Sequence, residues 1–201
     1  MSIRALVGLL HIERQSHQTQ IDDLRRYGAV EHEICRACGF DGSRYDVQEL
    51  TAALRGLGPR WNLLLVEAGP NIRRRPEPTV WSALEYAAHS RDITALHVFG
   101  VEQALTQDEP VYSSISDDLV DSAASTYLEA DPNDVGSELA GQASLLADVA
   151  EAAGTAKWSR GLTIGDSRSD VRRLLEHALH DSLHHLNDVE VGLTRLSKDG
   201  Q

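Results

Sequence analysis

The chain has 201 residues and a formal net charge of −12, and it is long enough to enclose one hydrophobic core. The acidic balance excludes a general nucleic-acid-binding protein, because neutralising phosphates takes clustered Lys and Arg. No apolar run approaches the ~20 residues that cross a membrane, and the first residues lack the basic-then-apolar pattern of a signal peptide. We therefore expect a cytoplasmic protein with neither a nucleic-acid nor a membrane partner.

Residues 1–45 are expected to form an extension that precedes the main domain. Ile3, Leu6 and Leu10 recur at helical spacing, so residues 2–27 predict an additional N-terminal helix. The middle of this segment is polar on all sides, which favours a helix on the surface or against a partner.

An irregular stretch follows, in which Cys35 and Cys38 form a Cys-x2-Cys-Gly-Phe pattern similar to a zinc knuckle. A structural zinc ion usually takes four ligands, and the chain has 2 cysteines. Histidine would have to complete such a site, with His32 as a candidate and His11 or His17 as others. A redox-active or structural disulfide and two ordinary thiols are also open from the sequence.

Residues 46–198 are expected to form the main domain, a bundle of four helices. Asp46 is the expected N-cap of the first helix, and Gly58-Pro59 predicts a kink or an interruption within it. A long polar connection after the second helix is expected to contain one short helix. The later elements are expected at residues 81–107 (helix), 116–128 (short helix), 135–153 (helix), 158–166 (turn-rich connector) and 167–196 (helix).

The last helix holds four of the nine histidines of the chain. His180 and His184 lie one helical turn apart on one side, close enough to hold a single ion. His177 can extend the same stripe, whereas His185 is rotated by about 100° from its neighbour. Two histidines on one helix make half of a metal site, so further ligands must come from another helix.

The helix at residues 81–107 is the best donor of the missing ligand. Trp81, Glu85, His89 and Asp92 are spaced by four, four and three residues, so they share one face. One histidine from this helix and an H-x3-H pair from the last would make a three-nitrogen site inside a bundle. Three protein ligands leave coordination positions open, which is typical of a catalytic metal centre.

The pattern W-x3-E-x3-H-x2-D, followed late in the chain by H-x3-H-H-x2-D-V, resembles the DinB-like superfamily of metal-binding helical proteins. The resemblance extends from about Cys35 to about Leu193 and is greatest to actinobacterial members with an early Cys-x2-Cys-Gly-Phe. It implies a four-helix bundle whose metal is held by His89, His180 and His184. Some relatives are thiol-dependent enzymes, among them mycothiol-dependent maleylpyruvate isomerase and S-transferases that use bacillithiol or mycothiol.

We therefore predict an all-α, DinB-like four-helix bundle with an extra N-terminal helix and a Cys-x2-Cys loop. The predicted metal is Zn²⁺, with Ni²⁺ or Fe²⁺ as alternatives, because imidazole suits all three. Glu85 and Asp188 are candidate carboxylates for orienting the metal-bound imidazoles, and His177 and His185 are candidate neighbours of the site.

The predicted function is a metal-dependent thiol transferase or isomerase, with a low-molecular-weight thiol as cosubstrate and a small electrophile as substrate. A divalent metal lowers the pKa of a bound water or thiol and so supplies a nucleophile at neutral pH. The alternatives are a metal-binding stress or sensor protein without turnover and a helical interaction module. A homodimer is expected because family relatives often dimerise. A metalloprotease of the H-E-x-x-H type is not expected, since Asp181 stands where the glutamate base should be.

Overall fold

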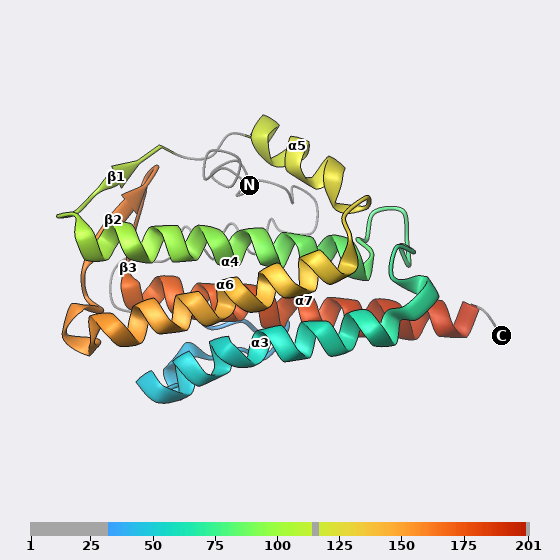
Figure 1. Cartoon of the computed structure of the whole chain (residues 1–201), viewed down its shortest axis with the longest axis horizontal. Helices are drawn as coiled ribbons and strands as arrows, with labels where there is room; N and C mark the ends of the chain where they lie inside the picture. Colours follow the sequence, from blue (N-terminus) through green and yellow to red (C-terminus); the bar gives the residue numbers. More distant parts are fainter. Residues whose placement is uncertain (1–31, 114–116, 200–201) are drawn as a thin grey trace.

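The computed structural model describes residues 32–113 and 117–199, and four long helices dominate them (Figure 1). This arrangement confirms the predicted four-helix bundle. The helix predicted for residues 2–27, with His11 and His17, lies outside the described residues. The long helices are α3 (Val47–Ala68), α4 (Ala83–Thr106), α6 (Pro132–Ala153) and α7 (Val171–Asp199).

Helices that are adjacent in the sequence are not all adjacent in the bundle. The α6 helix packs against both α3 and α4, and α7 packs against the same two helices. The consecutive helices α3 and α4 therefore lie mainly across the bundle from one another. As a result α4 and α7, which carry most of the described histidines, face each other along their length (Figure 1).

Side-chain caps fix where the helices begin. Asp46 caps α3, as predicted: its Oδ1 accepts from the backbone N–H of Glu49 at 2.8 Å, and the Glu49 carboxylate accepts from the backbone N–H of Asp46 at 2.9 Å. Ser82 and Glu85 form the same capping box at the start of α4. The α6 helix begins at Pro132, slightly earlier than predicted, since proline suits the first helical position.

The α3 helix runs without interruption through Gly58-Pro59, so the interruption considered from the sequence is absent. Proline removes one backbone hydrogen bond but leaves the helix intact here because buried side chains hold both halves, including Leu54 and Trp61. Gly58 serves the packing of the bundle. A Cβ atom at this position would come within 2.5 Å of the Cβ of Ala140 on α6, so the two helices approach closely only because the side chain is missing.

A small three-stranded sheet lies at one end of the bundle (Figure 1). Its strands are β1 (Val111–Tyr112), β2 (Gly161–Ile164) and β3 (Ser167–Asp170); β2 pairs parallel with β1 and antiparallel with β3. The predicted start of the last helix at Ser167 is wrong, because residues 167–170 pair with β2. Gly165, with φ +57°, turns the chain between the two strands.

The remaining elements are short. The predicted short helix within the polar connection is confirmed as α5 (Asp117–Tyr127), which packs on α4. The described residues also contain 3-10 turns at Gly42–Arg44, Gly69–Asn71 and Thr155–Lys157. Within residues 32–113 and 117–199, no helix has the length and apolar character of a membrane span.

Residues 32–45, the described part of the predicted extension, pack along α7. Phe40 is buried and stacks on the ring of His180, with ring centroids 5.0 Å apart. The Arg172 guanidinium donates to the carbonyl oxygens of Gly42 at 3.0 Å and Tyr45 at 2.7 Å. This segment therefore joins the hydrophobic core of the bundle and brings its cysteines against α7.

Candidate metal centres

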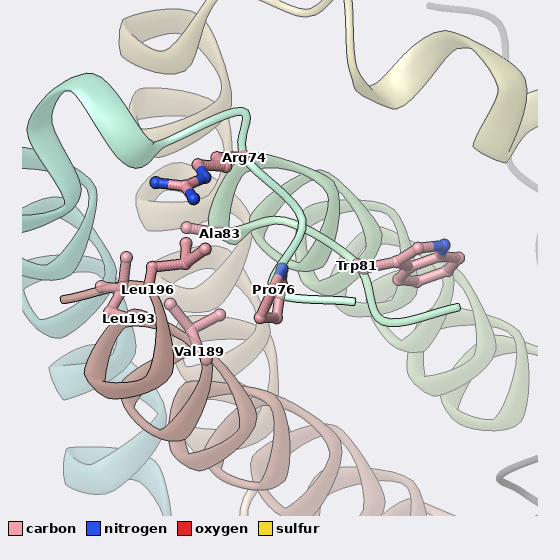
Figure 2. A pocket seen from close by; sticks show the side chains of 8 residues that line it. Arg74, Pro76, Trp81, Ala83, Val189, Leu193 and Leu196 are labelled. Carbon is pink, nitrogen blue, oxygen red and sulfur yellow. The ribbon is translucent and has the colours of Figure 1, made fainter. Parts of the chain in front are cut away.

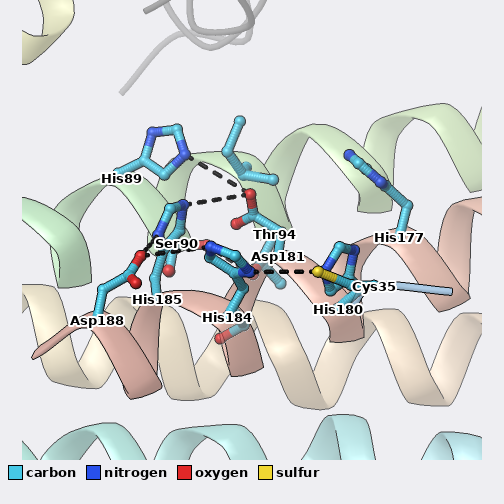
Figure 3. A network of polar contacts seen from close by, with 12 residues as sticks. Cys35, His89, Ser90, Thr94, His177, His180, Asp181, His184, His185 and Asp188 are labelled. Carbon is cyan, nitrogen blue, oxygen red and sulfur yellow. Dashed lines mark hydrogen bonds and ion pairs between the residues drawn. The ribbon is translucent and has the colours of Figure 1, made fainter. Parts of the chain in front are cut away.

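The α7 helix buries a row of polar side chains as well as leucines, and Figure 3 shows His180, Asp181 and His185 of this row. Burying polar or charged groups is costly unless each finds a partner. Ser182 has one, since its Oγ accepts from Nε1 of Trp61 at 2.7 Å. Glu176 has several, among them Arg172 and Nδ1 of His32. The other buried polar residues of the row are His180, Asp181 and His185, and they belong to two separate groups.

The first group, which we term the α4–α7 group, consists of His89, Asp181 and His185. Oδ1 of Asp181 lies 3.7 Å from Nε2 of His89 and 3.5 Å from Nε2 of His185. These separations exceed ordinary hydrogen-bond lengths. They are close to the roughly 3.3 Å that separates two ligand atoms of one ion at metal–ligand distances of about 2.0 Å. One ligand atom from each residue lies within 4.8 Å of the others.

The surroundings of this group orient its imidazoles. Nδ1 of His185 lies 3.1 Å from Oδ2 of Asp188, which directs Nε2 of the same ring toward Asp181. A carboxylate on the far nitrogen is the usual partner of a metal-binding histidine. The His89 ring packs against the Trp81 indole with centroids 5.3 Å apart, and the Tyr86 ring lies 4.9 Å from that of His185.

The charges of the α4–α7 group are strongly coupled. Burial alone would raise the pKa of Asp181, but His185 and His89 hold it well below its usual range. Burial would lower the pKa of His185, but Asp181 and Asp188 raise it to about 9. Below that pKa, a metal ion that binds His185 would displace its proton, which would link metal affinity to pH.

The second group, which we term the cysteine–histidine group, consists of Cys35, Cys38, His180 and His184. One ligand atom from each lies within 4.8 Å of the others. Both cysteines are free thiols, so no disulfide joins them. His32, predicted as their companion, instead contacts Glu176, with its Nδ1 2.8 Å from Oε1 of that residue.

The structure therefore does not bring His89, His180 and His184 into one group. His89 on α4 faces Asp181 and His185, whereas His180 and His184 face the two cysteines. The two pairs on α7 are interleaved and offset by one residue, which rotates them by about 100° around the helix. The packing of α7 turns the Asp181–His185 pair toward α4.

The residues that the sequence predicts beside the site make different contacts in the structure. Asp188 contacts both His184, at 3.6 Å, and His185, at 3.1 Å. His177 contacts the Glu33 carboxylate at 3.1 Å. Glu85 lies away from both groups: its carboxylate accepts from Ser82 and pairs with Arg75 at the start of α4.

Sequence reasoning missed two residues that contact the histidines of these groups. Asp181 was considered only as a protease base, although its four-residue spacing to His185 was a usable signal. Glu33 contacts both His177 and His180, and nothing in the sequence connects it with residues so distant along the chain.

A small pocket near the C-terminal end of α7 is separate from both groups (Figure 2). Arg74, Pro76, Val189 and Leu193 are among its lining residues. Trp81 also lines it, and Figure 2 shows its indole directed away from the aliphatic residues. The same indole packs on His89, so this side chain lies between the pocket and the α4–α7 group.

The fold and these groups define a four-helix bundle with metal-ligand side chains on its facing helices. A solved structure with a similar fold is YfiT from Bacillus subtilis, described as a probable metal-dependent hydrolase with an unusual four-helix bundle topology. The match has a TM-score of 0.69 and 15% sequence identity, and it covers 85% of this chain and 94% of YfiT. At this identity the likeness shows the fold. No protein-family model and no curated protein matches the sequence.

Proposed function

We propose that the chain is a divalent-metal-dependent enzyme whose metal is held by His89, Asp181 and His185. The observation that carries the proposal is the convergence of two imidazole Nε2 atoms on one carboxylate oxygen across α4 and α7. Imidazole and carboxylate suit Zn²⁺, our first choice, and they also suit Fe²⁺ and Ni²⁺. The same three residues would hold any of these ions.

A divalent ion with three protein ligands keeps open positions, at which it would lower the pKa of a bound water or thiol. The protein supplies the rest of the site. The side chains of His89 and Asp181 keep 11% and 12% of their surface exposed, so the described residues do not seal this group completely. Burial raises the pKa of Tyr86 to about 12, so this residue, whose ring packs against His185, stays neutral over the working pH range.

The leading reaction is thiol transfer to a small electrophile, or thiol-dependent isomerisation, with a low-molecular-weight thiol such as mycothiol as cosubstrate. Its support is the resemblance of the two histidine motifs to the DinB-like superfamily. Hydrolysis is the second candidate, because YfiT, whose fold is similar, is described as a probable metal-dependent hydrolase. The two candidates share the metal and differ in the nucleophile.

The experiment uses the full chain, produced without a histidine tag, beside His89→Ala and His185→Gln variants. Conjugation of mycothiol to monochlorobimane tests thiol transfer, and hydrolysis of p-nitrophenyl acetate without thiol tests hydrolysis. We expect the metal-loaded parent to accelerate conjugation, and each variant to lose at least a factor of roughly 100, since removing a group that acts in the transition state costs that much or more.

His32→Ala is the matched control, because it removes a half-exposed imidazole outside the α4–α7 group. It should retain the parent activity. Turnover of the ester alone would favour the hydrolase. Bound metal without either activity would favour a sensor protein and contradict the proposal.

A further inference from the structure

The cysteine–histidine group has the composition and spacing of a closed zinc site. A C-x2-C pair from residues 32–45 meets an H-x3-H pair from α7, which gives two sulfur and two nitrogen ligands. The Cys35 sulfur lies 3.7 Å from Nδ1 of His184. Two ligands of a tetrahedral zinc ion, at about 2.3 Å for sulfur and about 2.0 Å for nitrogen, are separated by roughly 3.5 Å.

The sulfur side is arranged as a tight turn. Gly39 adopts φ +77°, a conformation that costs little only for glycine. Its backbone N–H donates to the Cys35 carbonyl oxygen at 3.0 Å, and the N–H of Cys35 donates to the Phe40 carbonyl oxygen at 2.9 Å. These two backbone hydrogen bonds close the turn and hold the Cys35 sulfur 3.7 Å from Nδ1 of His184.

The nitrogen side presents one ring nitrogen from each histidine. Nε2 of His180 is buried and has no hydrogen-bond partner in the described part of the chain, while Nδ1 of the same ring contacts the Glu33 carboxylate. A buried polar atom without a partner costs about 1–3 kcal/mol, so this nitrogen calls for a ligand. For His184 the roles are exchanged: Nε2 lies 3.6 Å from Asp188 and Nδ1 faces Cys35.

We infer that Cys35, Cys38, His180 and His184 bind one Zn²⁺ as a closed structural site that fastens residues 32–45 to α7. Four protein ligands fill a tetrahedral zinc ion and leave no position for substrate, in contrast to the three ligands of the α4–α7 group. The site would join segments separated by more than a hundred residues, next to the stacking of Phe40 on His180. Loss of the ion should therefore loosen this segment and leave the α4–α7 group in place.

Cobalt substitution tests this assignment on the reduced, metal-free full chain. Co²⁺ bound by two thiolates and two imidazoles gives a sulfur-to-cobalt charge-transfer band in the near ultraviolet together with intense tetrahedral d–d bands. The α4–α7 group has no sulfur and cannot give the first band. We expect one equivalent of Co²⁺ to produce both features, and an equivalent of Zn²⁺ to remove them.

Variants then identify the ligands. In Cys38→Ser and in His184→Ala, we expect at least one of the two features, the sulfur band or the tetrahedral d–d bands, to disappear. The zinc content of each variant should fall by about one equivalent. His89→Ala should keep both bands, which separates this inference from the proposed function. His32→Ala should also keep them, because its imidazole contacts Glu176. Circular dichroism checks that each variant is folded.

Absence of the charge-transfer band in the reduced parent chain would overturn the inference, whatever its variants do. Loss of the band in His32→Ala with retention in His184→Ala would overturn it in favour of the other ligand set. A disulfide reagent gives a further check, because bound zinc should slow its reaction with Cys35 and Cys38. Equal reaction rates with and without zinc would also contradict the inference.

Discussion

Oδ1 of Asp181 on α7 lies 3.7 Å from Nε2 of His89 on α4, and this pairing defines which face of α7 looks toward α4. It places a carboxylate where a third imidazole was expected. With a divalent ion, the group would be one charge unit less positive than three neutral histidines. A lower net charge weakens the pull of the ion on a bound nucleophile, but it favours binding of the cation itself.

Asp181→Asn is expected to lower the metal affinity of the α4–α7 group by at least ~10–100-fold, the range seen when even an indirect carboxylate partner is lost. The pKa of His185 in the metal-free protein should fall from its value of about 9, because Asp181 is the main group that raises it. Chelator competition measures the affinity, and NMR titration of the His185 ring measures the pKa. Asp166→Asn, at an exposed turn, should change neither.

Gly58→Ala is expected to destabilise the bundle by about 1–3 kcal/mol, the usual range for overpacking. The new Cβ would lie 2.5 Å from the Cβ of Ala140 and force α3 away from α6. Gly56→Ala is the matched control on the same helix, since its Cβ would meet nothing within 4 Å. It should stabilise the protein by about 0.5–1 kcal/mol. Urea unfolding of both variants measures the difference, and a Gly58→Ala variant as stable as the parent would contradict this packing.

The hydrogen bond from Trp61 to Ser182 links α3 to the polar row of α7 at 2.7 Å. Trp61→Phe should leave the Ser182 hydroxyl buried without its donor, at a cost of about 1–3 kcal/mol in the free energy of unfolding. A double-mutant cycle with Ser182→Ala isolates the bond, and we expect a coupling energy of about 1 kcal/mol. Strict additivity of the two variants would show that the bond contributes nothing.

The metal-free protein should lose stability as the pH rises from 6.5 to 9. Burial would lower the pKa of His177, but Glu33 raises it from 6.5 to about 9. A raised pKa stabilises the folded state fully below pH 6.5, and this contribution disappears as the pH passes through 9. His185, also raised to about 9, adds to the same loss. The opposite shift of His97, lowered to about 4 by burial, makes stability increase from pH 4 to 6.5.

Thermal unfolding midpoints measured across this range should therefore be highest near pH 6.5. His177→Gln should flatten the decline above that pH without removing it, because His185 remains. A midpoint that increases steadily up to pH 9 would contradict the assigned pairing of His177 with Glu33.

The bundle could be predicted because its signals are local. Leucines at steps of three and four indicate the buried face of α3, and the capping pair Asp46 and Glu49 indicates where that helix begins. The strand at residues 167–170 could not be predicted, because its sequence SRSD is polar and short. Its pairing depends on β2, and β2 in turn pairs with a strand about fifty residues earlier.

The candidate site could be predicted only in part, for a geometric reason. The sequence placed the right histidine-rich helix opposite His89, but His184 and His185 are neighbours that point about 100° apart. Which of them faces α4 depends on how the whole helix is rotated in the bundle, and that rotation is set by its contacts with α3, α4 and residues 32–45. The contact of Glu33 with His180 likewise cannot be predicted from the sequence, because it joins two segments that are distant along the chain.

Glu33→Gln should weaken zinc binding at the cysteine–histidine group although Glu33 is not one of its ligands. The Glu33 carboxylate contacts Nδ1 of His180 and so directs Nε2 toward the cysteines. Loss of a carboxylate partner of this kind typically lowers metal affinity 10–100-fold, and we expect a decrease of about that size with the cobalt spectrum unchanged in shape. The pKa of His177 should fall at the same time, because Glu33 is the main group that raises it. An altered spectrum would mean that Glu33 is itself a ligand, whereas unchanged affinity would mean that the orientation of His180 is fixed by its stacking on Phe40 alone.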